Sequence, residues 1–357
     1  MDKKKNIKIV TMNAAYNYGA MLQAYALQET LKFLSYYPEF IDQRGLFNHK
    51  NKKDIRYFIR SFFSLFFQKQ VALGRSRFDD FINQYQTISS DKYGSYEEMQ
   101  NNPPRADVFL SGSDQVWNPT TIKPINFLEF VKDGTKKVSY AASLGVSKIP
   151  EHNKDQFKLL INEFDHISVR EEQGRDVIKE LTDKNIEVHL DPVFLLKKED
   201  WSKLSSEVPE VDYPYILCYI LYRPSWLNEY LKKIHNKTGL KIVVIDNSPF
   251  RNIFHHKMVR NAGPREFLWL IENAENVITS SFHGTAFATL FNKPFYAAVN
   301  PNAPSRISNL LNKLNLNNRI LETGNNIDFE DVSFIDANKV ISEERQRSQI
   351  YLQESIG

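Results

Sequence analysis

The chain has few groups that could crosslink it or hold a metal ion. Its 357 residues include a single cysteine, Cys218, which excludes an internal disulfide and a cysteine-rich zinc site. Its eight histidines are scattered, and only His255 and His256 are adjacent. We therefore expect a reducing compartment and no metal or other cofactor.

Long hydrophobic runs are also missing. No stretch of about 20 apolar residues occurs, which excludes a membrane-spanning helix. The apolar run at residues 7–12 is broken by Lys8 and stopped by Asn13, too early for the hydrophobic region of a signal peptide. The formal net charge of +3 is too small to suggest a nucleic-acid partner. These features predict a cytoplasmic protein that does not bind nucleic acid.

The length predicts two domains, because single hydrophobic cores stop growing at about 250 to 300 residues. Strand-like runs alternate with helical stretches, as in parallel α/β proteins. The expected strands are residues 6–12, 39–42, 107–113, 137–145, 166–170, 215–220, 241–246 and 276–280.

Asp191 and Pro192 end the first series of strands, since proline cannot continue a central strand. We expect two Rossmann-like domains that face each other across a cleft, at residues 1–192 and 193–335. A C-terminal helix at 336–357 is expected to cross back to the first domain.

Residues 280–290 combine a strand end, a hydroxyl-rich turn, a glycine and an apolar helix. Loops of this kind bind anions in parallel sheets, because the helix N-terminus supplies N–H groups and a positive dipole. Gly284 would let the backbone approach a ligand, Ser281 or Thr285 would cap the helix or donate to an oxyanion, and His283 could exchange a proton near neutral pH. The alternative is a capped helix with a hydrogen-bonded histidine and no ligand.

Six short motifs, in this order, resemble the polysaccharide pyruvyl transferase family. They are NYGAMLQAYAL at residues 17–27, SGSDQVWN at 111–118, SYAASLG at 139–145, SVRE at 168–171, LDPV at 190–193 and SFHG at 281–284. The resemblance runs from about residue 7 to about residue 320. It implies a GT-B-like α/β fold, phosphoenolpyruvate as the donor and a sugar hydroxyl, free or on a lipid-linked oligosaccharide, as the acceptor.

The resemblance also implies roles for single residues. His283 matches the catalytic histidine of the family, Arg170 matches its donor-binding arginine, and the backbone at Phe282 would lie against the donor. Ser281, Gly284 and Thr285 would complete the donor site in the C-terminal domain. For Arg170 the alternative is a surface ion pair with Glu171 or Glu172.

The acceptor is expected in the N-terminal domain. Asn17, Tyr18 and Gly19 carry groups that hydrogen-bond sugars, or they form only a turn before a helix. Asp114 could take the proton of a sugar hydroxyl beside the aromatic ring of Trp117, or it could cap a helix. Ser143 and Gly145, at the end of the next strand, are weaker candidates.

Residues 54–69 are rich in phenylalanine and arginine at helical spacing. This helix, part of an insert at about residues 50–85 in the first domain, would pack on its own sheet or lie on an anionic membrane surface. In the second case the enzyme would be peripheral at the inner face of the membrane.

Two other functions share this architecture. A GT-B nucleotide-sugar glycosyltransferase is the nearer one, although no acidic residue follows Gly284 where a ribose hydroxyl would be held. A two-domain binding protein would normally be exported, and the sequence has no export signal.

Overall fold

The computed structural model describes residues 4–44, 46, 68–132, 134–246, 252–300, 305–321, 329 and 332–357. The chain divides into two compact units. Unit 1 comprises Met1–His49, Ile82–Leu196 and Ile341–Gly357, and unit 2 comprises Lys50–Phe81 and Lys197–Val340. The chain therefore enters and leaves unit 1 more than once.

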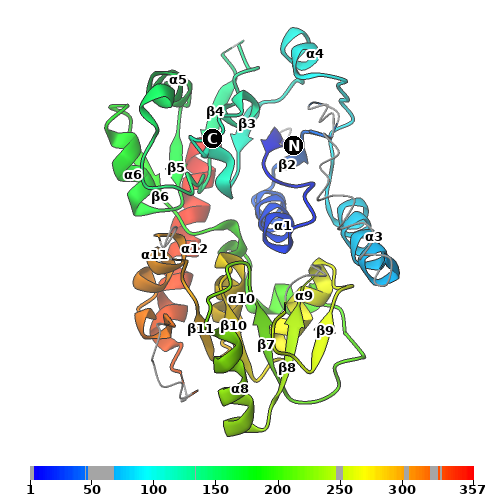
Figure 1. The fold of residues 1–357 in the computed structure, drawn as a ribbon. Helices are drawn as coiled ribbons and strands as arrows, with labels where there is room; N and C mark the ends of the chain where they lie inside the picture. The colour runs from blue at the N-terminus through cyan, green and yellow to red at the C-terminus, as the bar shows by residue number, and fades with distance from the viewer. Residues whose placement is uncertain are drawn as a thin grey trace. The chain divides into compact units, whose positions relative to one another are not determined.

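Unit 1 is built on parallel strands (Figure 1). Four of them pair in the order β2-β1-β3-β4, single bridges connect β4 with β5, and β5 pairs with β6. Their bounds are β1 Asn6–Val10, β2 Tyr37–Phe40, β3 Val108–Ser111, β4 Lys136–Ser139, β5 Ile167–Val169 and β6 Ile186–Val188. Because all six are parallel, their carboxyl ends lie along one edge.

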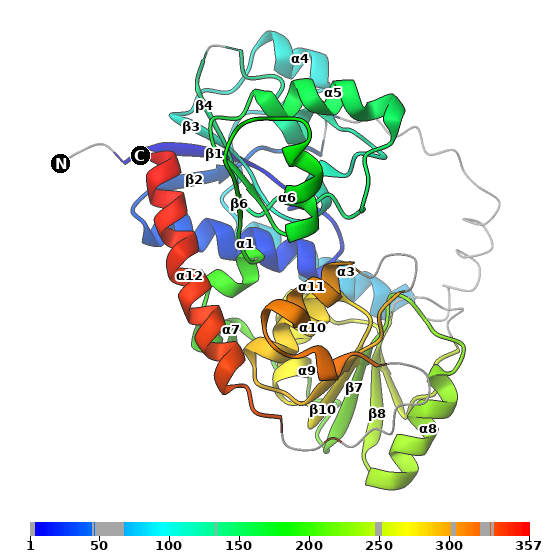
Figure 2. The ribbon, with the colours of Figure 1, turned by 90° about the vertical axis from the view of Figure 1, so that its left-hand side faces the viewer.

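Helices cover these strands. They are α1 Tyr18–Phe33, the end of α3 Gln68–Tyr85, α4 Tyr96–Asn101, α5 Glu151–Asn162, α6 Glu172–Lys179 and most of α12 Ile335–Ile356, with 3-10 turns η2 Gln115–Trp117, η3 Pro124–Phe127 and η4 Pro192–Leu195. Figure 2 shows the last turns of α12 beside β1 and β2. There Leu352 and Ile356 join the core of Ile7 and Ile9, and Lys5 Nζ donates to the Ile356 carbonyl at 3.0 Å.

Unit 2 contains one parallel sheet in the order β11-β10-β7-β8-β9. Its elements are α7 Lys198–Leu204, β7 Tyr215–Tyr219, α8 Leu227–Thr238, β8 Lys241–Ile245, β9 Lys257–Val259, α9 Pro264–Glu272, β10 Asn276–Thr279, α10 Phe282–Leu290, β11 Phe295–Ala297, α11 Ser305–Lys313 and η5 Asn317–Arg319. Helix α8 packs on one face through Leu227, Leu231 and Ile234. On the other face Phe267 of α9 and Phe287 of α10 meet edge to face.

The alternation of strands and helices is confirmed, and each expected strand is present with shifted ends. The expected strand at 39–42 begins earlier, at Tyr37, and includes Pro38. An edge strand such as β2 tolerates a proline, because its missing N–H need not pair with a neighbouring strand. Strands β6, β9 and β11 were not expected. Each has three residues, which is too short for a periodic pattern in the sequence.

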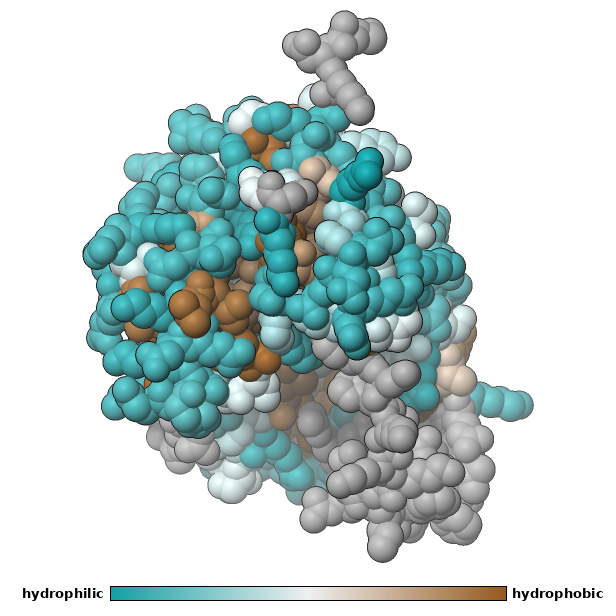
Figure 3. Space-filling model, turned by 90° about the horizontal axis from the view of Figure 1, so that it is seen from above, coloured by the Kyte–Doolittle hydropathy of each residue, from teal (hydrophilic) through white to brown (hydrophobic). Residues whose placement is uncertain are grey.

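No helix within the described part of the chain is long and apolar enough to cross a membrane. The face of the molecule in Figure 3 is mostly hydrophilic, with separate small hydrophobic areas. Of the aromatic and basic segment at 54–69, residues 54–67 lie outside the described residues.

The single cysteine lies in the core of unit 2. Cys218 is 0% exposed in the middle of β7, and burial, helped by the charge of Asp246, raises the pKa of its thiol. A thiol that is both inaccessible and protonated reacts slowly with alkylating reagents. We expect iodoacetamide to leave the native protein unmodified at pH 8 and to modify Cys218 once in denaturant, as read by intact mass. Rapid labelling of the native protein would contradict this packing.

Candidate functional site

In unit 2 the candidate site is the first turn of α10, which follows the carboxyl end of β10. Ser281 caps the helix, because its hydroxyl accepts from the Gly284 N–H at 3.3 Å. The Ser281 N–H donates to Thr279 Oγ1 at 3.1 Å, and Thr279 donates to the Tyr219 carbonyl at 2.7 Å. These bonds fix the start of α10 against β10 and β7, so the predicted cap is confirmed.

The structure gives Gly284 a packing role in this turn and corrects the expectation for Thr285. A Cβ atom on Gly284 would lie 2.3 Å from Thr279 Oγ1, so the glycine is required for close packing of the helix on the sheet. Approach of a ligand is not needed to explain it. Thr285 is 0% exposed and its hydroxyl donates to the Ser281 carbonyl at 3.0 Å, so it is turned into the helix and not toward an oxyanion.

His283 lies in the same turn. It is 7% exposed, and its ring meets that of Phe282 edge to face at 5.1 Å. The neighbouring Ser280 hydroxyl accepts from the Leu221 and Tyr222 N–H groups, both at 2.8 Å, which joins this loop to the loop after β7. An imidazole is thus held at the carboxyl end of two adjacent strands, beside a helix N-terminus that favours negative charge.

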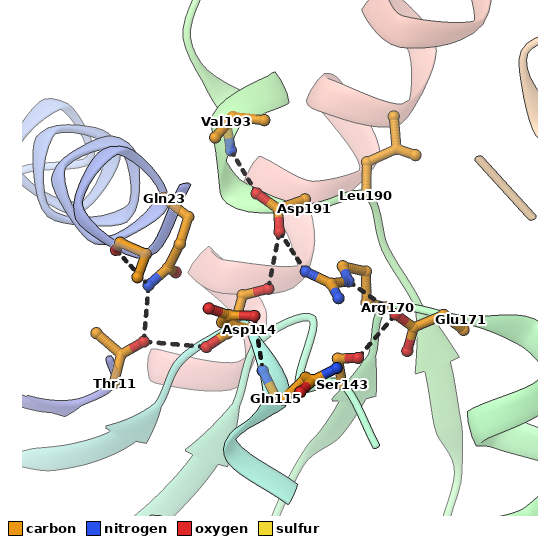
Figure 4. Close-up of polar contacts among 12 residues, drawn as sticks. Thr11, Gln23, Asp114, Gln115, Ser143, Arg170, Glu171, Leu190, Asp191 and Val193 are labelled. Atoms are coloured by element: carbon orange, nitrogen blue, oxygen red, sulfur yellow. Dashed lines mark hydrogen bonds and ion pairs between the residues drawn. The ribbon is translucent and has the colours of Figure 1, made fainter. Parts of the chain in front are cut away.

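In unit 1 polar side chains meet at the carboxyl ends of the strands (Figure 4). Arg170, after β5, lies between two carboxylates. Its Nη1 donates to Asp191 Oδ2 at 2.7 Å and its Nε donates to Glu171 Oε1 at 2.8 Å. The side chains of Arg170 and Asp191 are 2% and 0% exposed. Ser143 after β4 donates to the same Glu171 oxygen at 2.8 Å.

This arrangement changes the interpretation of Arg170. The ion pair with Glu171 is present, but it is buried, and Asp191 is a second partner that was not expected. Glu172 pairs with Arg175 instead. Burial lowers the pKa of Arg170, but the charges of Glu171 and Asp191 outweigh it and raise the pKa above its usual value. Arg170 therefore stabilises this edge of unit 1, and its donor-binding role stays a prediction.

Asp114 adopts a strained backbone conformation beside this cluster. Its φ and ψ are 67° and −173°, a region that only glycine visits freely. Its Oδ1 accepts from the Gln115 N–H at 2.9 Å, so the predicted capping of a short helix is present. Strain of this kind costs about 1 to 3 kcal/mol and gathers at functional sites. Asp114 is thus the strongest candidate residue of unit 1.

The other acceptor candidates differ in accessibility. Asn17 is exposed and caps α1 through the Ala20 N–H at 3.1 Å, whereas Tyr18 and Gly19 are buried at the start of the helix. Trp117 is 0% exposed and stacks on Phe127, with its indole N–H donating to the Asn126 carbonyl. A sugar cannot reach it, so the expectation of an aromatic platform there is wrong.

Ser143 and Gly145 support the loops of this edge. Ser143 is 0% exposed and bonds to Glu171 as described above. Gly145 has a φ of +68°, and a Cβ there would lie 2.5 Å from Gln115 Nε2. The Ser143 N–H also donates to the Asp114 carbonyl at 3.0 Å, and Gly145 leaves room for Gln115, so both residues shape the loop that carries Asp114.

The sequence profile of polysaccharide pyruvyl transferases matches residues 17–302, which is most of the chain. The chain belongs to the polysaccharide pyruvyl transferase family. None of the curated proteins compared with it matches in sequence.

The fold is shared with nucleotide-sugar epimerases. The UDP-GlcNAc 2-epimerase of Neisseria meningitidis, bound to UDP-GlcNAc, is 10% identical with a TM-score of 0.53, over 99% of this chain and 94% of the epimerase. A putative UDP-N-acetylglucosamine 2-epimerase of Listeria monocytogenes is 12% identical with a TM-score of 0.53, over 100% and 90%. These similarities and the parallel sheets of the two units confirm the predicted GT-B-like class of two Rossmann-like domains.

Some polar residues of this pyruvyl transferase family member were not expected at the strand ends. Asp191 was interpreted only as the end of a domain, and Glu171 only as a surface partner of Arg170. Asp246 follows β8 in unit 2, and Arg260 donates to its carbonyl at 3.2 Å. For Asp246 the available signal was an acidic residue directly after an apolar run, whereas Asp191 follows a short stretch in which polar and apolar residues alternate. No group of three metal-binding side chains occurs among the residues that the structure describes.

Proposed function

We propose that the protein transfers the pyruvyl group of phosphoenolpyruvate to a hydroxyl of a sugar or a lipid-linked oligosaccharide and releases phosphate. The proposal rests on membership in the family and on one observation, the placement of His283 in the first turn of α10. This turn combines a protonatable side chain with a helix N-terminus, as an anionic donor requires.

The reaction begins with two proton transfers. A proton adds to the donor methylene, C2 becomes electrophilic, and the sugar oxygen bonds to C2 while its own proton leaves. The bond between C2 and the bridging oxygen then breaks, and phosphate departs with that oxygen. The C2 cation that remains is closed either by a second hydroxyl of the sugar, which loses its proton and gives a ketal, or by loss of a methyl proton, which gives an enolpyruvyl ether. His283 supplies the proton to the methylene or to the departing phosphate, and either role is general acid catalysis.

Asp114 is proposed to accept the hydroxyl proton. A carboxylate held in a strained conformation at the edge of unit 1 is suited to this role, because strain of this kind fixes its direction before the substrate binds. Its Oδ1 is bonded to the Gln115 N–H, which further limits its rotation.

The test is to incubate the protein with phosphoenolpyruvate and a panel of nitrophenyl glycosides and lipid-linked oligosaccharides. We expect phosphate release that depends on the acceptor and a product heavier by one pyruvyl group. Phosphate release without any such product would contradict transfer.

A second candidate is a nucleotide-sugar glycosyltransferase. Its support is the fold shared with the UDP-GlcNAc 2-epimerases and the carboxylate of Asp246 after β8. Release of UDP from UDP-GlcNAc in the presence of the same acceptors, with none of phosphate from phosphoenolpyruvate, would favour it.

We also propose that residues 54–69 bring the enzyme to an anionic membrane surface, because apolar and aromatic residues recur there at helical spacing while Arg56 and Arg60 fall on another stripe. The protein should co-sediment with vesicles rich in acidic lipids, less with neutral vesicles, and less as salt rises.

The control for this prediction is a matched pair of variants. Phe62→Ser with Phe66→Ser should reduce sedimentation without changing turnover on a short soluble acceptor. Leu159→Ser, which removes a side chain that is 73% exposed on α5, should leave sedimentation unchanged. Unfolding of the double variant would instead assign the phenylalanines to the core.

A further inference from the structure

Strand β9 lies at one edge of the unit 2 sheet, beside β8 (Figure 1). It has three residues, Lys257–Val259, which pair with residues 243–245 of β8. At its carboxyl end, the Asp246 N–H donates to the Val259 carbonyl at 3.3 Å. A strand this short makes few bonds to its neighbour, so the bonds at its two ends determine how firmly it is held.

The amino end of β9 is held by a histidine side chain. The backbone N–H of His256 donates to the Ile242 carbonyl at 2.9 Å, and the Ile242 N–H donates to His256 Nδ1 at 3.0 Å. The imidazole thus takes the place that a backbone carbonyl would have in the next step of the ladder. A ring nitrogen that accepts this bond carries no proton, so the proton of the neutral His256 ring is on Nε2.

A second imidazole lies against the first. His235, near the end of α8, has its ring centroid 4.2 Å from that of His256. Its Nδ1 bonds to the Leu240 carbonyl at 2.9 Å, and because a carbonyl can only accept, this nitrogen carries the proton. The two neutral rings are therefore held in opposite tautomers. Phe254 packs beside both, with its centroid 6.0 Å from that of His235 and 5.3 Å from that of His256.

The two rings respond differently to an added proton. His235 can accept one on Nε2 and keep its bond to the Leu240 carbonyl. His256 can accept one only on Nδ1, where it would replace the lone pair that the Ile242 N–H uses. Protonation of His256 therefore breaks one of the two bonds that attach the amino end of β9 to β8.

The surroundings of the pair are positively charged. Lys241 of β8 and His255 add to the field at His256, and Lys232 of α8 lies 5.8 Å from the centroid of the adjoining phenylalanine ring. Neither imidazole forms an ion pair with a carboxylate among the residues that the structure describes. Burial of the ring, followed by the charges of His235, Lys241 and His255, lowers the pKa of His256. The folded state thus favours the neutral ring that accepts the bond.

We propose that His235 and His256 form an acid-sensitive clasp, which holds β9 on the sheet of unit 2 near neutral pH and releases the amino end of this strand as the pH falls. The clasp is independent of the proposed transfer reaction. It lies at the amino end of the parallel sheet, whereas His283 follows the carboxyl end of β10.

The pH range of the switch follows from the environment of His256. An unfolded histidine binds its proton at about pH 6.5, whereas folded His256 binds it only at a lower pH because its pKa is lowered. The stabilisation by the clasp is therefore complete above about pH 6.5 and is lost as the pH falls from there through the pKa of the folded ring.

The direct test is hydrogen exchange of the Ile242 amide in the full chain, followed by NMR near neutral pH and in mild acid. Its protection factor, which corrects for the pH dependence of intrinsic exchange, should fall about fivefold on acidification, as for the loss of one average hydrogen bond. Amides of β7, in the middle of the sheet, should keep their protection. An Ile242 protection factor that stays constant would overturn the proposal.

Replacing His256 by asparagine separates the hydrogen bond from the proton. The asparagine Oδ1 lies about where the histidine Nδ1 does and can accept the Ile242 N–H, but it does not titrate. His256→Asn should keep the urea midpoint of the wild type near neutral pH and lose less of it in mild acid. His152→Asn, which replaces an exposed histidine of α5, should lose as much as the wild type. An equal acid loss in His256→Asn and the wild type would show that the clasp is wrong.

Nitrogen NMR of the imidazole rings tests the geometry itself, because protonated and unprotonated ring nitrogens have different chemical shifts. Near neutral pH we expect the proton on Nε2 of His256 and on Nδ1 of His235. The titration of His256 and the change in the Ile242 amide signal should share one midpoint, below that of an unfolded histidine. The same tautomer in both rings, or a midpoint of His256 at or above that of an unfolded histidine, would contradict the clasp.

Discussion

Replacing His283 by alanine is expected to lower the rate of pyruvyl transfer by a factor of about 10² to 10⁴, the usual contribution of a general acid. The imidazole lies in the first turn of α10, beside the Ser281 cap and at the carboxyl end of β10. Its removal leaves the bonds that fix this turn intact, because they are made by Ser281 and Thr279. The measurement is acceptor-dependent phosphate release at saturating donor.

A second histidine of unit 2 provides the control. His235 lies at the other end of the sheet, near the end of α8, where its Nδ1 bonds to the Leu240 carbonyl at 2.9 Å. His235→Ala should keep turnover within about twofold of the wild type, because it is remote from the proposed chemistry. Free imidazole should partly restore turnover of His283→Ala and should not affect His235→Ala. Full turnover by folded His283→Ala would remove this residue from the mechanism.

Replacing Arg170 by methionine is expected to destabilise the protein by about 3 to 5 kcal/mol, the usual cost of leaving a buried charge without its partner. Asp191, whose side chain is 0% exposed, would lose its ion pair, and Glu171 would lose the same guanidinium. The urea midpoint should therefore fall markedly. Asp191→Asn, added to Arg170→Met, should recover part of the loss by removing one stranded charge.

Arg175 on α6 gives the matched control. It also pairs with two carboxylates, Glu172 and Asp176, but its side chain is 33% exposed. Exposed pairs contribute about 0 to 1 kcal/mol, so Arg175→Met should shift the midpoint little. An equal effect of the two variants would contradict a structural role for the buried cluster.

A conservative variant separates the structural role from donor binding. Arg170→Lys keeps the charge but cannot reach two carboxylates with a fixed fork. If Arg170 acts only on the fold, this variant should lower the urea midpoint and leave the KM for phosphoenolpyruvate unchanged. A higher donor KM at an unchanged midpoint would restore Arg170 to the donor site.

The elements at the donor loop could be predicted because their signals are local. Residues 277–279 are β-branched, Ser281 is a good cap and the helix after Gly284 is mostly apolar, so strand, cap and helix follow from neighbouring residues. The reason for Gly284 could not be predicted. It depends on contact with Thr279 and Tyr219, and Tyr219 comes from another strand.

The acceptor side was harder to predict because its contacts are distant in sequence. Trp117 looks like an accessible ring within a loop, yet Phe127 and Phe164 enclose it. Arg170 looks like a free cation, yet Asp191, 21 residues later, follows the three-residue strand β6 and reaches it. The strain at Asp114 is a property of backbone angles, for which the sequence around an aspartate carries no signal.

The bond that breaks in phosphoenolpyruvate tests the central claim most directly. The donor is labelled with ¹⁸O at the oxygen between C2 and phosphorus and incubated with the protein and an acceptor. Transfer of the pyruvyl group cleaves the bond from C2 to oxygen, so the account predicts the label in inorganic phosphate and none in the pyruvylated sugar. Label retained in free pyruvate would show attack at phosphorus and would contradict pyruvyl transfer.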